Sequence, residues 1–97
     1  MVMHNQPHPG EFIAEVYLRP NYMSVRELAV ALRVSPSTLS RLVNGDTSIS
    51  PVMALRLSKA LGRSPESWLA MQSNYDLWHV RRDAKLGKIV KLRLSAA

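Results

Sequence analysis

Polar and basic side chains suited to binding a polyanion are concentrated between residues 35 and 48. Arg41 carries two planar N–H donors that match the O6 and N7 atoms of guanine in the major groove of DNA. Ser37 can form hydrogen bonds with more than one kind of base. Pro36 offers only apolar contact, for example to a thymine methyl group. The remaining candidates carry hydroxyl or amide groups that suit phosphate oxygens: Ser35, Thr38, Ser40, Asn44, Thr47 and Ser48.

Two short helices must position these residues. Ser24 followed three residues later by Glu27 is the pattern of a capping box, and apolar residues continue from there at helical spacing. Ser35 before Pro36 predicts the start of the second helix, because serine caps free amides and the fixed φ of proline suits the first helical position. Gly45 supplies the left-handed conformation that ends this helix.

Arg33 and Val34 are nearly all that remains between the two helices, so the helices must cross steeply and share a core. The expected shared core consists of Ala29, Val34, Leu39 and Leu42. This pattern resembles the helix-turn-helix family of phage-type repressors, whose turn usually carries glycine where this chain has Arg33. We therefore expect either a left-handed Arg33, at some cost in energy, or a slightly different turn.

Proline and glycine divide the rest of the chain into three further helices. A first helix is expected over residues 11–18, ended by Pro20. Ser50 and Ser64, each followed by proline, repeat the serine-proline start for a fourth and a fifth helix. The predicted fold class is all-α, a five-helix, phage-repressor-like helix-turn-helix domain over residues 8–83.

The two ends of the chain are expected to lie outside this domain. Residues 1–7 lack periodicity and predict a flexible N-terminal arm, and residues 84–97 form a basic C-terminal tail. Leucine and valine alternate with cations near the end of the tail as in a strand, although Leu86, Ile89 and Val90 fit a continued helix. A short extended segment is favoured, because Gly87 weakens a helix there. Such a tail could pair across a dimer, lie against phosphates or remain solvated.

Composition limits the class of protein. A chain of 97 residues with 46% hydrophobic content suits one small domain with a single core. The formal charge of +6 suits a polyanionic partner, and most cations lie in residues 24–63 and 81–97, on either side of an acidic fifth helix. The absence of cysteine excludes disulfides and thiolate metal sites. No apolar run is long enough for a signal peptide or a membrane span, so we expect a cytoplasmic protein without membrane association.

Motifs spread along the domain make the resemblance more specific. They are HPGE at residues 8–11, LVNG at 42–45, IS at 49–50, ALRLS at 54–58, and SPESWL at 64–69 followed by Gln72 and YDL at 75–77. This combination is similar to the HigA family of antitoxins over about residues 8–78. The resemblance implies a homodimer that binds double-stranded operator DNA with a palindromic sequence and represses its own operon. It also implies neutralisation of a HigB-type toxin, a ribosome-dependent endoribonuclease.

Dimerisation also follows from the motif, because one such helix covers only a few base pairs and two-fold DNA sites match two-fold proteins. We expect the fifth helix or the tail to form the dimer.

Three other functions are alternatives to an antitoxin. A stand-alone phage-type regulator without a toxin would carry the same motif and is the main alternative. An enzyme would need a site built from His4, His8 and His79 with a carboxylate, and their spacing does not support one. We therefore expect no catalytic residue, cofactor or metal. A protein-binding module without DNA contact conflicts with Arg41 in a basic helix.

Overall fold

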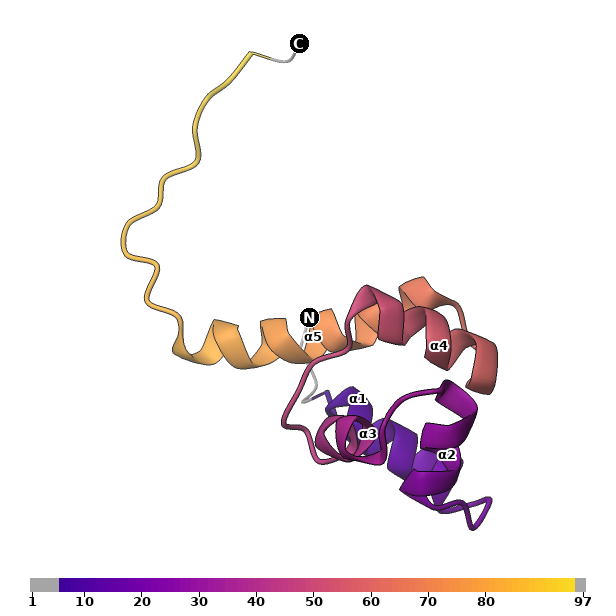
Figure 1. The fold of residues 1–97 in the computed structure, drawn as a ribbon. Helices are drawn as coiled ribbons and strands as arrows, with labels where there is room; N and C mark the ends of the chain where they lie inside the picture. Colours follow the sequence, from indigo (N-terminus) through magenta and orange to yellow (C-terminus); the bar gives the residue numbers. More distant parts are fainter. Residues whose placement is uncertain (1–5, 96–97) are drawn as a thin grey trace.

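The computed structural model describes residues 6–95 (Figure 1); part of the predicted arm and the last two residues of the tail lie outside them. Its described residues contain helices and no strand, which confirms the all-α fold class. The first predicted helix is a short α-helix that continues as a π-helix. The elements in chain order are α1 (Pro9–Ile13), η1 (Ala14–Leu18), α2 (Val25–Leu32), α3 (Pro36–Val43), α4 (Pro51–Leu61) and α5 (Pro65–Asp83).

The predicted serine caps are present at the start of four helices. At α2, the Ser24 hydroxyl accepts from the Glu27 amide at 3.0 Å while the Glu27 carboxylate accepts from the Ser24 amide at 3.2 Å, which confirms the capping box. The hydroxyls of Ser35, Ser50 and Ser64 each accept from the third amide of the helix that follows, at 3.1, 3.1 and 3.0 Å. These bonds fix where α2 to α5 begin.

The first helix begins two residues earlier than predicted, because its cap is not a hydroxyl. The Nδ1 atom of His8 accepts a hydrogen bond from the Gly10 amide at 2.9 Å, and Pro9 occupies the first helical position. A histidine ring therefore does here what serine does at the other helices. The predicted start at residue 11 is therefore wrong.

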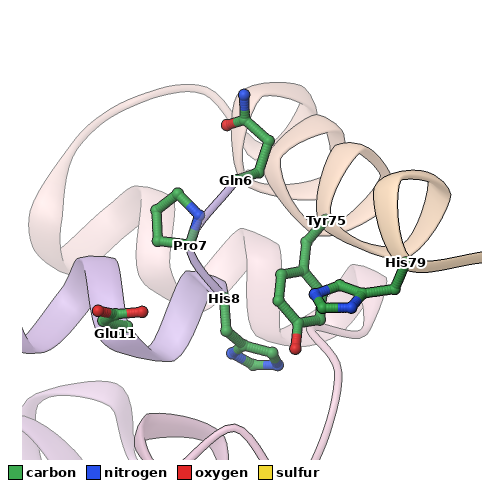
Figure 2. Close-up of a pocket in the computed structure, with 6 residues that line it drawn as sticks. All are labelled: Gln6, Pro7, His8, Glu11, Tyr75 and His79. Carbon is green, nitrogen blue, oxygen red and sulfur yellow. The ribbon is translucent and has the colours of Figure 1, made fainter. Parts of the chain in front are cut away.

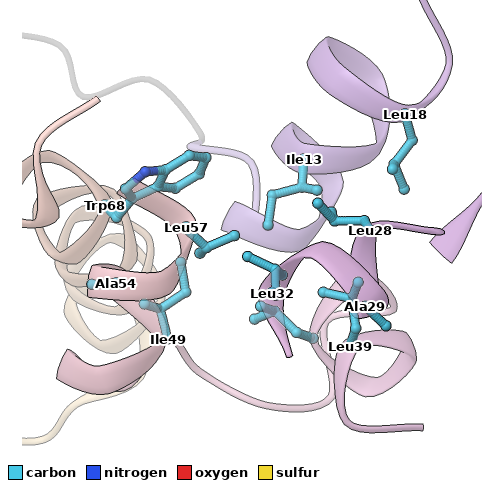
Figure 3. Packing of buried hydrophobic residues seen from close by; sticks show 11 residues of the cluster. Ile13, Leu18, Leu28, Ala29, Leu32, Leu39, Ile49, Ala54, Leu57 and Trp68 are labelled. Carbon is cyan, nitrogen blue, oxygen red and sulfur yellow. The ribbon is translucent and has the colours of Figure 1, made fainter. Parts of the chain in front are cut away.

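A single core joins all the helices (Figure 3). The buried hydrophobic residues are Ile13, Leu18, Leu28, Ala29, Leu32, Leu39, Leu42, Ile49, Ala54, Leu57 and Trp68. Of the predicted shared core, Ala29, Leu39 and Leu42 are buried and Val34 is partly buried against them. The Trp68 ring is fully buried, and its indole N–H donates to the Gly62 carbonyl at 3.0 Å, so its only polar atom is satisfied.

Arg33 adopts the left-handed conformation, with φ 59° and ψ 44°. The first of the two alternatives for the turn is therefore correct. The turn is closed by hydrogen bonds from the Arg33 amide to the Val30 carbonyl at 3.2 Å and from the Val34 amide to the Ala29 carbonyl at 3.1 Å. A side chain in this conformation costs roughly 1 kcal/mol, which the packed helices on either side must offset.

The start of α1 packs directly against the end of α3. A Cβ atom added to Gly10 would lie 1.9 Å from the carbonyl oxygen of Leu42 and 2.8 Å from the Cα of Val43. The backbones of the two helices therefore approach more closely than any side chain would allow. The His8 ring lies beside Gly45, where an added Cβ would come within 3.7 Å of it.

The tail leaves the end of α5 and runs clear of the other elements (Figure 1). Its described residues, 84–95, are exposed and form neither helix nor strand.

Gly10→Ala should lower the free energy of unfolding by about 3 kcal/mol, because the added methyl group must displace the backbone of α3. Chemical denaturation measures this change. Gly87→Ala is the control, since Gly87 lies in the exposed tail and nothing lies within 4 Å of its added Cβ. Equal stability of the two variants would contradict the close approach.

Candidate nucleic-acid interface

The predicted site residues lie along α3, its N-cap and the loop that follows it. The structure therefore brings them together in one continuous stretch. Two of them, Thr38 and Ser40, are half-buried. The others are exposed: Ser35, Pro36, Ser37, Arg41, Asn44, Thr47 and Ser48. Their contact with DNA stays a prediction.

The first turn of α3 gathers three hydroxyl groups. The Ser35 Oγ atom lies 2.7 Å from Thr38 Oγ1 and 3.2 Å from Ser37 Oγ, and it also accepts from the Thr38 amide. Capping thus uses one lone pair of Ser35 and leaves the neighbouring hydroxyls at the surface. Because amides at a helix N-terminus carry partial positive charge, this end of α3 suits a phosphate oxygen.

A buried glutamine holds the loop that carries Thr47 and Ser48. The amide of Ile49 donates to Gln72 Oε1 at 2.9 Å, and Gln72 Nε2 donates to Asp76 Oδ1 at 3.0 Å. The Ile49 side chain is itself buried in the core. The loop is therefore anchored to α5 at its final residue. The sequence shows Gln72 only as part of a family motif. Its structural role could not be predicted, because its hydrogen-bond partner Ile49 lies 23 residues away in the chain.

Two of the six cations in residues 24–63 stabilise the fold. Arg56 Nη1 donates to the Leu32 carbonyl at 2.8 Å, which satisfies a backbone acceptor at the C-terminal end of α2. The Arg63 guanidinium lies over the Phe12 ring at 5.2 Å and over the Trp68 ring at 5.7 Å. The other four cations of this segment are exposed: Arg26, Arg33, Arg41 and Lys59.

The two described histidines, His8 and His79, have structural contacts. His8 caps α1, the His79 ring makes a tilted contact with the Tyr75 ring, and His4 lies outside the described residues. Between residues 6 and 95, no three histidine or carboxylate side chains lie close enough to hold a metal ion. In the same part of the chain, no helix combines the length and apolarity needed to cross a membrane.

A helix-turn-helix family model matches residues 15–68. The chain belongs to the helix-turn-helix family. Among curated relatives, antitoxin HigA-1 of Vibrio cholerae is 40% identical over 83 residues, which is 84% of this chain and 78% of the relative. An uncharacterised HTH-type transcriptional regulator of Escherichia coli, YddM, is 37% identical over 92 residues, covering 95% of this chain and 97% of that one.

Solved structures of antitoxins share the fold. Antitoxin GraA matches with a TM-score of 0.84 at 33% identity, over 92% of this chain and 99% of GraA. Pseudomonas aeruginosa antitoxin HigA with the higBA promoter matches with a TM-score of 0.75 at 29% identity, over 87% and 98% of the two chains. These similarities confirm the resemblance to HigA antitoxins. This helix-turn-helix protein is a DNA-binding, antitoxin-like regulator, in a family whose members are not enzymes.

Arg56→Ala should destabilise this helix-turn-helix protein by about 2 kcal/mol, because the end of α2 loses a charged hydrogen-bond donor. Arg41→Ala is the matched control and should stay within about 0.5 kcal/mol of wild type, since its side chain is exposed. Urea denaturation of both variants measures the difference. Similar losses would mean that the two arginines do not differ in structural role.

Proposed function

We propose that this protein is an antitoxin that binds its own operator as a homodimer, represses its operon and neutralises a HigB-type endoribonuclease toxin. The main support for DNA binding is the exposed polar face of α3, which carries Arg41 in its last turn. The likeness to antitoxin HigA-1 and to GraA supports the toxin-binding half. Such a regulator would act in the cytoplasm.

In the proposed complex, α3 lies in the major groove and α2 crosses the DNA backbone. Arg41 donates two hydrogen bonds to guanine, and Pro36 and Ser37 face neighbouring bases. Hydroxyl and amide side chains on either side bind phosphates and set the position of α3: Ser35, Thr38, Ser40, Asn44, Thr47 and Ser48. Because Arg41 is the only long hydrogen-bonding side chain in this set, DNA shape and a second half-site would supply the rest of the specificity.

A dimer would place two copies of α3 about 34 Å apart, one helical turn of DNA. Large apolar side chains that the chain itself leaves exposed support this proposal. Leu77 and Val80 are exposed on α5. The tail exposes five more: Leu86, Ile89, Val90, Leu92 and Leu94. Burying this surface against a second copy removes it from water, so α5 and the tail are the proposed interface.

A stand-alone regulator without a toxin is the second candidate. The name of YddM, an HTH-type transcriptional regulator, favours it, because this relative matches nearly the whole chain. The two candidates differ in one observable. An antitoxin gene is accompanied by a gene for a small basic ribonuclease, and a stand-alone regulator gene is not.

Arg41→Ala should lose the preference for the operator by about 1–3 kcal/mol per half-site while keeping salt-sensitive background binding. The assay is binding to a labelled duplex from the gene's own upstream region, with competitor DNA, at low and physiological salt. Lys59→Ala is the control, since it removes an exposed cation from α4 instead of α3. If wild type and Arg41→Ala bind alike, Arg41 does not read bases. If neither binds, the autoregulatory proposal is wrong and partner binding becomes the leading account.

Removal of residues 84–97 should show whether α5 or the tail forms the dimer interface. A truncated protein that remains dimeric by light scattering assigns the interface to α5, and a folded monomer assigns it to the tail. The domain should keep its helical content in both cases, because described tail residues 84–95 are exposed and pack on no element. A full-length protein that is monomeric at all concentrations would contradict the dimer.

A further inference from the structure

A groove runs between α1 and α5 and continues to the end of α3. One part, of about 380 Å³, is lined by Gln6, Pro7, His8, Glu11, Tyr75 and His79. A second part, of about 530 Å³, shares three of these residues and extends along η1 to Asn44 and Gly45. Figure 2 shows Tyr75 and His79 reaching from α5 toward His8 at the start of α1. Of the residues proposed to contact DNA, Asn44 alone lines this groove, at its far end.

His8 presents a hydrogen-bond donor to the groove. Its side chain is more than nine-tenths buried, and its Nδ1 atom accepts from the Gly10 amide. The proton of the neutral ring must therefore sit on Nε2. Within residues 6–95, no group accepts from this Nε2–H, and it is not sealed in the core. Such a donor is available to water or to a backbone carbonyl of a bound peptide.

The groove also carries negative charge. The carboxylate of Glu11 pairs with no cation in the described part of the chain, and Glu15 at the far side is held by Arg19 at 2.7 Å. The Tyr75 ring contacts the His8 ring edge-on, with ring centroids 4.9 Å apart, and contacts the His79 ring in a tilted arrangement, with centroids 4.3 Å apart. An unpaired carboxylate beside aromatic rings is an environment that suits a guanidinium group.

We propose that this groove binds an arginine-bearing segment of the toxin, an inference that rests on the proposed antitoxin function. The guanidinium pairs with Glu11 and lies against Tyr75, and a carbonyl of the same segment accepts from His8 Nε2–H. A ribonuclease must present cations to bind RNA phosphates, so its charge complements the groove. Phosphates are disfavoured beside Glu11, because its carboxylate, with which no cation of the described residues pairs, repels them.

The experiment compares two charge reversals in the full-length chain. Glu11→Lys reverses the charge in the groove, and Glu66→Lys reverses an exposed charge that does not line it. The two are matched, since each glutamate lies in the first turn of a helix and loses the same interaction with the helix dipole. The probe is the purified small basic protein encoded beside this gene, titrated by calorimetry.

Glu11→Lys should weaken toxin binding at least about 10-fold, whereas Glu66→Lys should stay within about twofold of wild type. Tyr75→Leu, which keeps an apolar side chain but removes the aromatic face, should also weaken it. Melting temperatures of all variants identify any loss of folding, and a second variant at Tyr75 keeps the test valid if one variant is unstable.

The outcomes separate the inference from the function on which it rests. If wild type does not bind the neighbouring protein, the proposed toxin partner is wrong, and the inference fails with it. If wild type binds and the variants at Glu11 and Tyr75 bind equally well, only the inference is wrong. It is also overturned if Glu11→Lys changes operator affinity or oligomeric state while toxin binding is unchanged, because the groove then belongs to a DNA or dimer contact.

Discussion

The close packing of α1 on the end of α3 is the contact on which the arrangement of the domain depends. Gly10 allows the two backbones to meet at the Leu42 carbonyl, and His8 both caps α1 and lies beside Gly45. From there α1 reaches α5, since Phe12 packs edge-on against Trp68 with ring centroids 5.9 Å apart. The position of α3 is therefore set by contacts at its C-terminal end, next to Arg41.

Most of the fold could be predicted from the sequence because its signals are local. Serine caps, prolines at first helical positions and glycine stops act within four residues, so the starts of α2 to α5 and the ends of α3 and α4 follow from them. Arg56 could not be predicted in the same way, because its acceptor lies 24 residues away on another helix. The histidine cap of α1 was equally hidden, since imidazole is not among the common capping groups.

The same difference between local and long-range contacts decides which parts of the candidate sites could be predicted. The polar residues of α3 are consecutive in the chain, so residue types and helix limits were enough to place them at the surface together. The groove between α1 and α5 combines His8 and Glu11 with Tyr75 and His79, which only tertiary packing brings together. In the sequence those histidines were isolated, and their relation to a carboxylate and a tyrosine could not be seen.

The shortness of α2 and α3 has a consequence for the dynamics of DNA recognition. Each has only eight residues, too few for a helix to persist in water without tertiary contacts. Their amides should therefore exchange hydrogen only when the core around Trp68 opens, and not through local fraying of one helix. DNA binding is then linked to global folding. The free energy of unfolding of the whole domain should rise with the concentration of DNA that it binds.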